Sequence, residues 1–280
     1  MVPESRLYTF IDGNREYALY FLEGQKLIQD LALVHSLRKE GFAYFRDVVL
    51  SVQPMVALLK GGEQFGFYID SEEPYFRLKI ETAHHGTTRC MLHPEEFREF
   101  PETMRGLVRV QKVFPSSPRY ESVLRVEGLP LREIVNRVLE ESYQVNCAMM
   151  LSQVSDQSLM LHQLPRPSQE DFDFSPQAAK AQRETMRERL SGIFAVGMTE
   201  REEIVRAFDA VGFRLIADRP MRFFCGCSKE RMIDNLQAVY AQHGDSLFEA
   251  DGTLEVVCEY CKSRYTIKRI ELIRAGGGAH

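Results

Sequence analysis

Four cysteines in the last quarter of the chain constrain its fold more than any other feature. One glycine separates Cys225 from Cys227, thirty residues follow, and two residues separate Cys258 from Cys261. Zinc prefers four soft ligands in a tetrahedron, and two cysteine pairs on separate turns supply such a set. The spacing therefore predicts a small domain in which Cys225, Cys227, Cys258 and Cys261 bind one Zn²⁺ in the reduced form.

The residues around each pair predict how the pairs are presented. Strand-like runs at 254–257 and 265–267 flank the second pair, which places that pair on a hairpin turn. The first pair is tighter than the common spacing. Gly226 relieves crowding there, because glycine has no side chain and accepts dihedral angles closed to other residues. Ser228 follows as the expected N-cap of a helix over 229–241.

Composition limits the class of protein without identifying it. The chain has 280 residues, 44% of them hydrophobic and 27% charged, which is typical of a globular protein with one large or two ordinary domains. Six cysteines are few for a secreted fold held by disulfides. No apolar run approaches the ~20 residues of a membrane-spanning helix, and the N-terminus lacks the basic start and apolar stretch of a signal peptide. We therefore expect no membrane association and a reducing compartment.

Residues 1–164 predict an α+β domain that combines a mixed sheet with a few helices. Aromatic-rich or alternating runs predict strands at 15–21, 64–69, 75–80 and 107–113, and a hairpin formed by 147–151 and 159–162. Apolar residues three or four apart predict helices over 44–60 and 129–143. Pro54 would end or kink the first of these helices.

Residues 165–221 predict a mainly helical, metastable linker. A polar, proline-containing stretch opens it, and Ser175 followed by Pro176 predicts a helix start. From 177 to 190 the only sizeable apolar side chains are Met186 and Leu190, so this helix has little surface to bury and should be marginal.

A second helix is expected to start with a capping box at Thr199–Glu202 and to stop at Gly212. Residues 222–272 form the predicted four-cysteine domain. The glycine-rich residues 273–280 are expected to be a disordered tail.

Two stretches around the cysteines closely resemble one known family. Residues 223–231 contain Cys-x-Cys-Ser-x-Glu-Arg, and residues 251–261 contain Asp-Gly-x-x-Glu-x-x-Cys-x-Tyr-Cys. Both resemble the C-terminal zinc domain of the redox-regulated holdase family, the thirty-three-kilodalton heat-shock proteins. Upstream, residues 127–144 and 158–165 resemble parts of the same family, whereas the rest of the N-terminal domain is divergent.

The resemblance implies an ATP-independent chaperone of the bacterial cytoplasm, not an enzyme. The reduced, zinc-bound form would be folded and inactive, and a monomer or weak dimer. Oxidative stress would form two disulfides, Cys225 with Cys227 and Cys258 with Cys261, and release the zinc. The linker would then unfold, and an active homodimer would bind unfolding client proteins. We add the hypothesis that residues 168–220 form part of the client site, because disordered segments adapt to varied apolar partners.

Other functions remain open at this point. Four-cysteine zinc sites are often purely structural, and the chain could be a zinc-ribbon nucleic-acid-binding or regulatory protein. Against nucleic acid, the net charge is −5, and residues 218–280 hold nine basic and nine acidic side chains. The basic residues Lys262, Arg264, Lys268 and Arg269 nevertheless cluster.

An enzyme would need a second site. His84, His85, Cys90 and His93 are the candidates, but no motif supports them, and Cys258–Cys261 lacks the strand–helix context of a disulfide oxidoreductase. His243 is expected to be a loop histidine, because four thiolates already complete a zinc site. Cys90 and Cys147 are expected to take no part in the redox chemistry.

Overall fold

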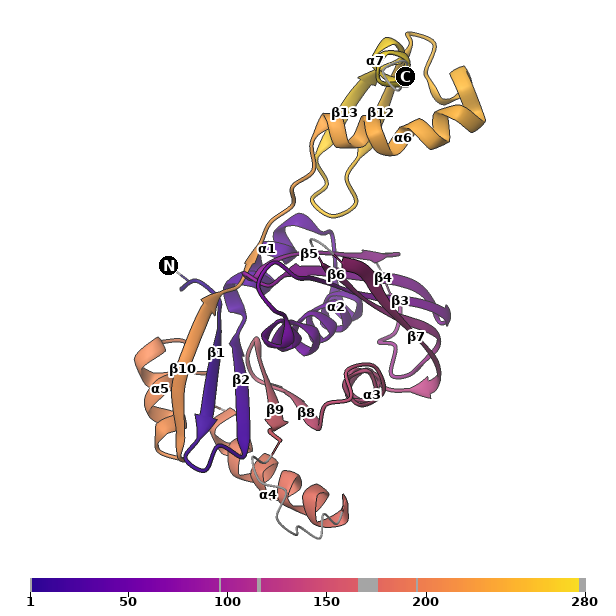
Figure 1. Cartoon of the computed structure of the whole chain (residues 1–280). Coiled ribbons are helices and arrows are strands. Elements are labelled where there is room, and N and C mark those ends of the chain that lie inside the picture. The colour runs from indigo at the N-terminus through magenta and orange to yellow at the C-terminus, as the bar shows by residue number, and fades with distance from the viewer. Residues whose placement is uncertain (1, 96, 115–116, 166–175, 195, 277–280) are drawn as a thin grey trace. The chain divides into compact units, whose positions relative to one another are not determined.

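The structure is a computed structural model that describes residues 2–95, 97–114, 117–165, 176–194 and 196–276. The chain divides into two compact units, Met1–Phe223 and Phe224–His280, which are called unit 1 and unit 2 below. Unit 1 combines two sheets with helices, and unit 2 has a hairpin and two α-helices (Figure 1). The α+β class predicted from the sequence is confirmed. Within the described residues, no helix is long and apolar enough to cross a membrane.

The first sheet of unit 1, sheet A, has the strand order β10-β1-β2-β9-β8 and is antiparallel throughout. Its strands are β1 (Arg6–Asp12), β2 (Tyr17–Glu23), β8 (Cys147–Leu151), β9 (Gln157–Gln163) and β10 (Phe213–Pro220). All seven residues of β2 are buried, because this central strand is covered on both faces. The hairpin predicted at 147–151 and 159–162 is present as β8 and β9.

The second sheet, sheet B, has the order β11-β5-β4-β3-β6-β7. Its strands are β3 (Gln64–Glu73), β4 (Tyr75–Ala83), β5 (Thr87–His93), β6 (Met104–Phe114), β7 (Ser117–Leu129) and β11 (Arg222–Phe223). Only β11 runs parallel to its neighbour, β5. Buried and exposed residues alternate along β4, as the period-two pattern of its sequence predicts.

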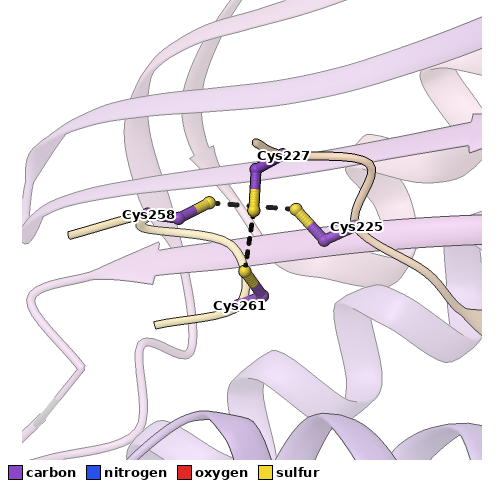
Figure 2. A group of neighbouring side chains, drawn as sticks. All are labelled: Cys225, Cys227, Cys258 and Cys261. Carbon is purple, nitrogen blue, oxygen red and sulfur yellow. Dashed lines mark hydrogen bonds between the residues drawn. The ribbon is translucent and has the colours of Figure 1, made fainter. Parts of the chain in front are cut away.

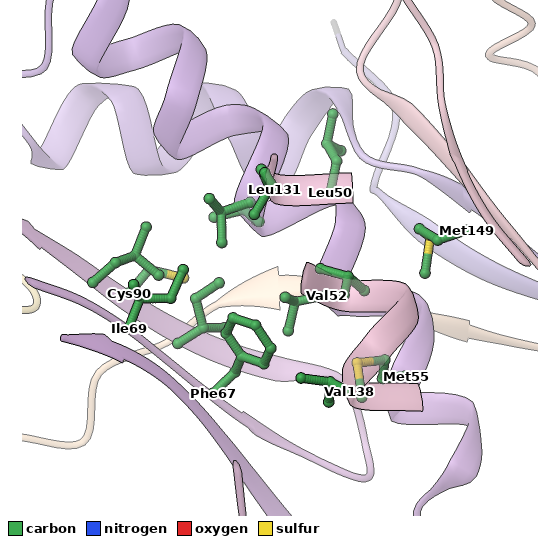
Figure 3. Close-up of a cluster of buried hydrophobic side chains, with 14 of the residues drawn as sticks. Leu50, Val52, Met55, Phe67, Ile69, Cys90, Leu131, Val138 and Met149 are labelled. Carbon is green, nitrogen blue, oxygen red and sulfur yellow. The ribbon is translucent and has the colours of Figure 1, made fainter. Parts of the chain in front are cut away.

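Helices fill the space beside sheet B and complete the main core of unit 1. They are α1 (Gln25–Val34), α2 (Lys39–Val52), α3 (Leu131–Arg137), the 3₁₀ turn η1 (Gln53–Leu58) and the π turn η2 (Val138–Ser142). Figure 3 shows side chains of α2 and η1, such as Val52 and Met55, beside Phe67 and Ile69 of β3 and Val138 of η2. Cys90 belongs to this cluster and is fully buried, as expected of a bystander thiol.

Two predicted helices are shorter than the sequence pattern suggests. The helix expected over 44–60 ends at Val52 and tightens into η1, because Pro54 has no amide proton to continue the α-helical hydrogen bonds. The helix expected over 129–143 is α-helical only to Arg137 and widens into the π turn η2.

The part of the chain predicted as linker packs onto sheet A. It contains α4 (Pro176–Phe194), α5 (Arg201–Asp209) and then β10, and residues 176–194 and 196–220 are called the linker segment below. Its side chains and one face of sheet A share a second core cluster, formed by Tyr8, Phe10, Tyr17, Leu19, Phe21, Met150, Leu159, Leu161, Leu190, Phe194, Met198, Ile204, Phe208 and Phe213. The ring centroid of Phe208 lies 4.6 Å from that of Phe10 and 5.1 Å from that of Phe21.

Three details of the predicted linker are corrected. The mainly helical linker predicted over 165–221 ends in a strand, because residues 213–220, which follow the predicted helix stop at Gly212, pair with β1 at the edge of sheet A. The N-cap of α5 is Glu200 without a side-chain hydrogen bond, so Thr199 does not form the expected capping box. The expected N-cap Ser175 lies outside the described residues, and α4 begins at Pro176.

The described side chains of the helix α4 differ in burial along its length. Leu190 and Phe194 are buried near its C-terminal end, and Met186 is partly buried. Among the described side chains before Met186, those of Ala181, Glu184 and Thr185 are exposed. Burial of apolar surface provides most of the stability of a helix in a protein, so, among its described side chains, this helix is anchored near its C-terminal end.

Unit 2 consists of α6 (Lys229–His243), the 3₁₀ turn η3 (Gly244–Leu247), the hairpin β12 (Thr253–Val257) and β13 (Arg264–Lys268), and α7 (Arg269–Gly276). Residues 273–276, predicted as disordered tail, are helical. The sequence 269–274 supplies Ile270, Leu272 and Ile273, and the burial of Leu272 anchors this last helix. Residues 277–280 lie outside the described residues.

A buried carboxyl group lies where the linker segment attaches to sheet A. Glu23 at the end of β2 is 2% exposed and pairs in register with Gln157, whose side-chain amide donates to the carbonyl of Met198. The backbone N–H of Gln25 donates to Glu23 Oε1 at 3.1 Å, whereas Oε2 has no hydrogen-bond partner among the described residues. Burial raises the pKa of Glu23 from its ordinary 4.5 to about 7, against the lowering effect of the Gln25 N–H.

We predict that Glu23→Gln weakens the pH dependence of stability. A carboxyl group whose pKa is raised by folding favours the folded state most below its unfolded pKa, and this advantage is lost as the pH rises from about 4.5 to about 7. Raising the pH from 5 to 8 should therefore lower the free energy of unfolding of the wild type by ~2–3 kcal/mol more than that of the variant. Urea unfolding at each pH measures this difference. The exposed Glu72→Gln serves as control. Equal pH profiles for the wild type and Glu23→Gln would contradict this account.

Candidate metal centre

The four cysteines predicted as ligands come together in unit 2. Their sulfur atoms all lie within 4.8 Å of one another and point toward a common centre (Figure 2). The Sγ atoms of Cys225 and Cys258 are 3.8 Å apart, and those of Cys227 and Cys261 are 3.2 Å apart. In a tetrahedron with metal–sulfur distances of ~2.3 Å, neighbouring sulfurs lie about 3.8 Å apart. The cluster could therefore hold one metal ion.

The hairpin turn presents the second pair as predicted. The N–H of Cys258 donates to the carbonyl of Ser263 at 2.9 Å, and the N–H of Lys262 donates to the carbonyl of Cys258 at 2.7 Å. Lys262 has a φ of 60°, which turns the chain sharply just after Cys261. These bonds hold Cys258 and Cys261 on the same side of the turn.

The first pair is fixed by the start of α6. Ser228 caps this helix by accepting the N–H of Arg231, as the sequence predicts. The Arg231 guanidinium reaches back and donates to the carbonyl of Gly226 at 2.6 Å. A Cβ on Gly226 would lie 3.3 Å from Arg231 Nη1, so glycine is favoured by this close approach. The expectation of unusual dihedral angles is corrected, because Gly226 does not have a positive φ.

Unit 2 has a thin apolar core. Among its described residues only Cys258, Ile267 and Leu272 are buried, and α6 has no buried residue. A domain this small rarely folds on apolar burial alone, and such domains commonly depend on a metal or disulfides. Two of the ion pairs that tie α6 and η3 to the rest of the unit, Lys229–Glu271 at 2.7 Å and Asp245–Arg269 at 2.8 Å, are partly or largely exposed and contribute little.

Without a cation, the thiols of Cys225, Cys258 and Cys261 differ in their pKa. Burial raises the pKa of Cys225 to about 12 and also raises that of Cys258. Burial acts in the same direction on Cys261, but hydrogen bonds with Ser263 and the neighbouring sulfurs outweigh it and lower the pKa of Cys261 to about 7. Four thiolates in so small a volume repel one another, and a divalent cation among them removes that repulsion.

Two hydroxyl groups of the hairpin also contact the sulfurs. The Oη atom of Tyr265 lies 3.0 Å from Cys227 Sγ, and Ser263 Oγ lies 3.2 Å from Cys261 Sγ. The contact with Cys227 raises the pKa of Tyr265 to about 12, so its hydroxyl keeps its proton. The cysteine spacing gives no reason to single out these residues or Arg231. The signal available was the position of Arg231 within the first family-like stretch and of Ser263 and Tyr265 directly after the second.

The other candidate residues do not assemble into a second site. His84 and His85 precede β5, Cys90 is buried within that strand, and His93 ends it, so the strand itself keeps them apart. His84 Nδ1 accepts the N–H of Gly62, which is a structural role. Within the described residues the four-cysteine group is the one cluster of metal-binding side chains, and His243 does not belong to it.

Comparison with known proteins places this geometry in a family. A family model described as Hsp33 protein matches residues 5–268. The chain belongs to the Hsp33 family. The chain is therefore an Hsp33-type chaperone. Its four clustered cysteines agree with a zinc-binding, redox-related family.

Individual relatives agree with this assignment. The 33 kDa chaperonin of Nitrosococcus oceani is 28% identical over 209 residues, which cover 72% of this chain and 70% of that protein. The 33 kDa chaperonin of Pseudomonas putida F1 is 29% identical over 170 residues, which cover 57% of this chain and about half, 54%, of that protein. Both Hsp33 relatives are named as chaperonins and not as enzymes.

A solved Hsp33 structure has the same fold. The 33 kDa chaperonin of Thermotoga maritima superposes with a TM-score of 0.75 over 97% of each chain, at 14% sequence identity. At this identity the match speaks for the fold alone. The divergence noted in the N-terminal sequence has therefore left the Hsp33 architecture in place.

We predict that metal binding separates the six cysteines into two groups. Cys258→Ser and Cys261→Ser should lose most of the bound metal, because each removes one of four ligands, whereas Cys90→Ser and Cys147→Ser should keep one ion per chain. Elemental analysis of the reduced, purified variants measures this. Full metal content in Cys258→Ser, or its loss in Cys90→Ser, would contradict the assignment.

Proposed function

We propose that this protein is a redox-regulated, ATP-independent holdase that binds unfolding proteins under oxidative stress in the bacterial cytoplasm. The observation that carries the proposal is the cluster of four cysteine sulfurs within 4.8 Å in a chain of the Hsp33 family. Family membership supports the chaperone role. The sulfur cluster supports redox control, because thiolates are the groups that oxidants attack.

Zn²⁺ is the ion we assign to the reduced form, one per chain, with Cys225, Cys227, Cys258 and Cys261 as ligands. Four thiolates at tetrahedral spacing are a preferred structural set for zinc. When bound, zinc keeps the thiolates deprotonated and contributes free energy to folding. Unit 2 needs that contribution, because only three of its described residues are buried.

Oxidation then removes the ligands two at a time. With peroxide as oxidant, two thiolates lose one electron each and form one S–S bond, while the O–O bond breaks and takes up two electrons and two protons to give two waters. We assign the bonds as Cys225 with Cys227 and Cys258 with Cys261, because each pair is adjacent in sequence and the family resemblance implies this pairing. Sulfurs of different pairs also lie close together, at 3.8 Å for Cys225 and Cys258 and 3.2 Å for Cys227 and Cys261, so peptide mapping of the oxidised protein is the direct check.

Loss of the metal site can reach the linker segment through the chain itself. Only Phe224 lies between β11 and Cys225, and only Met221 lies between β10 and β11. Unfolding of unit 2 therefore removes the folded domain that follows β11, and leaves the two-residue pairing of β11 with β5 as the anchor after β10. The weakly held helix α4 is the part of the linker segment expected to respond first.

Release of the linker segment would expose an apolar surface suited to client proteins. Eight of the fourteen residues of the second core cluster, including Phe10, Phe21 and Leu159, belong to β1, β2, β8 and β9 of sheet A, and Phe194 and Phe208 of the linker segment cover this face. A large exposed apolar face binds other apolar surfaces, and an unfolded segment adapts to varied partners. We propose that clients bind to this face together with residues 168–220, and that the oxidised form is a homodimer whereas the reduced form is a monomer or weak dimer.

The decisive experiment follows zinc release and chaperone activity together. Wild-type protein treated with peroxide at raised temperature should release about one zinc per chain and then suppress aggregation of a thermally unfolding client without ATP. Reduced protein should do neither. Cys90→Ser should behave as the wild type and is the matched control for thiol loss outside the cluster. Zinc release without any gain in aggregation suppression would leave a purely structural zinc site.

A further inference from the structure

Each of the four sulfurs has its own set of hydrogen-bond donors. The N–H of Cys227 serves Cys225, the N–H groups of Tyr260 and Cys261 serve Cys258, and the N–H of Ser263 serves Cys261. Cys227 contacts a side-chain hydroxyl group, that of Tyr265, whose Oη lies 3.0 Å from the sulfur. Ser263 Oγ adds a second contact to Cys261 at 3.2 Å.

The phenol group must be the donor when Cys227 is a metal ligand. A coordinated sulfur carries no proton, and the hydroxyl of tyrosine can donate. The backbone of Tyr265 is fixed by strand pairing, since Tyr265 lies in β13 and pairs in register with Val256 of β12. Its side chain is half-buried beside the cluster. Donors of this kind around a metal site orient the ligand and tune its reactivity.

We infer that Tyr265 is a positioning residue that protects the Cys225–Cys227 pair from oxidation, and that Ser263 does the same, more weakly, for the Cys258–Cys261 pair. The inference rests on the proposed redox function and goes beyond it, because it assigns control of each disulfide to a separate side chain. Ser263 is the weaker of the two since it is exposed and its backbone N–H remains when the hydroxyl is removed.

The chemistry explains the direction of the effect. In the first step a thiolate lone pair attacks peroxide, an S–O bond forms, the O–O bond breaks, and the departing hydroxide takes a proton to leave as water. In the second step the other thiolate attacks the sulfenic sulfur, an S–S bond forms, the S–O bond breaks, and the departing hydroxide takes up a proton to leave as a second water. A hydroxyl group that donates to the sulfur lone pair stabilises the thiolate before it attacks peroxide. This hydrogen bond must break before the S–O bond can form. The hydrogen bond therefore slows the first step.

Pair-resolved oxidation rates test the inference. Reduced, zinc-loaded Tyr265→Phe, Ser263→Ala and wild-type protein are exposed to a fixed excess of peroxide, quenched early with an alkylating reagent and analysed by peptide mass spectrometry. Tyr265→Phe should raise the initial rate of Cys225–Cys227 disulfide formation by roughly three- to tenfold, which is the effect of losing one hydrogen bond of typical net strength to the attacking sulfur. The initial rate at Cys258–Cys261 should stay unchanged. Ser263→Ala should raise the initial rate at Cys258–Cys261 by a smaller factor and leave the rate at Cys225–Cys227 unchanged.

Tyr240→Phe is the matched control. It removes a phenol hydroxyl from the same unit, where that group contacts Asp245 Oδ1 at 3.3 Å and not a sulfur, so neither pair should change its rate. Metal content and the Co²⁺–thiolate absorption of each reduced variant show whether the site is intact. Equal acceleration of both pairs in Tyr265→Phe, or no acceleration, overturns the inference.

The two proposals fail separately. Aggregation suppression by oxidised wild-type protein tests the proposed function and does not depend on Tyr265. If the wild type is activated by peroxide but the variants show no pair preference, only the control by hydroxyl groups is wrong. If Tyr265→Phe does not retain metal, Ser263→Ala is the independent test, and the absence of its preference for Cys258–Cys261 overturns the inference.

Discussion

The clustering of four sulfur atoms is the constraint on which the rest of the structure depends. Unit 2 places them within 4.8 Å of one another while burying only Cys258, Ile267 and Leu272 among its described residues. Apolar burial at this scale does not offset the conformational entropy of ordering about fifty residues. In the proposed reduced form, a bound divalent cation would offset most of the repulsion among the thiolates and would contribute the free energy that unit 2 lacks.

In unit 1 the linker segment covers one face of sheet A. The aromatic side chains of sheet A pack against Phe194 and Phe208, and the buried side chains of α4 among the described residues lie near its C-terminal end. Polar contacts add to the attachment, since Gln157 donates to the carbonyl of Met198 and Ser152 Oγ to that of Phe194 at 3.5 Å. The buried carboxyl group of Glu23 weakens this attachment at neutral pH, because burial raises the pKa of Glu23 to about 7. Such a balance suits a segment that is docked in one state and released in another.

The sequence predicted the parts of the fold whose causes are local. The cysteine spacing, the Ser228 cap and the hairpin around Cys258–Cys261 follow from short-range chemistry and are all present. The strand β10 was missed because its stability comes from pairing with β1, some two hundred residues away in the chain, which no local pattern reveals. Tyr265 was missed as a partner of Cys227 for a similar reason, since the two residues are 38 positions apart and meet only in the folded unit.

Hydrogen exchange along the linker segment tests the central claim most directly. Amide protection over residues 176–209 is measured in the reduced, zinc-bound protein and after peroxide treatment, with the buried strands β3 and β6 as internal reference. The account predicts that protection in α4 and α5 is lost on oxidation while the reference strands stay protected. Equal protection of α4 and α5 in both states would contradict it, because the sulfur cluster would then have no control over the segment that covers sheet A.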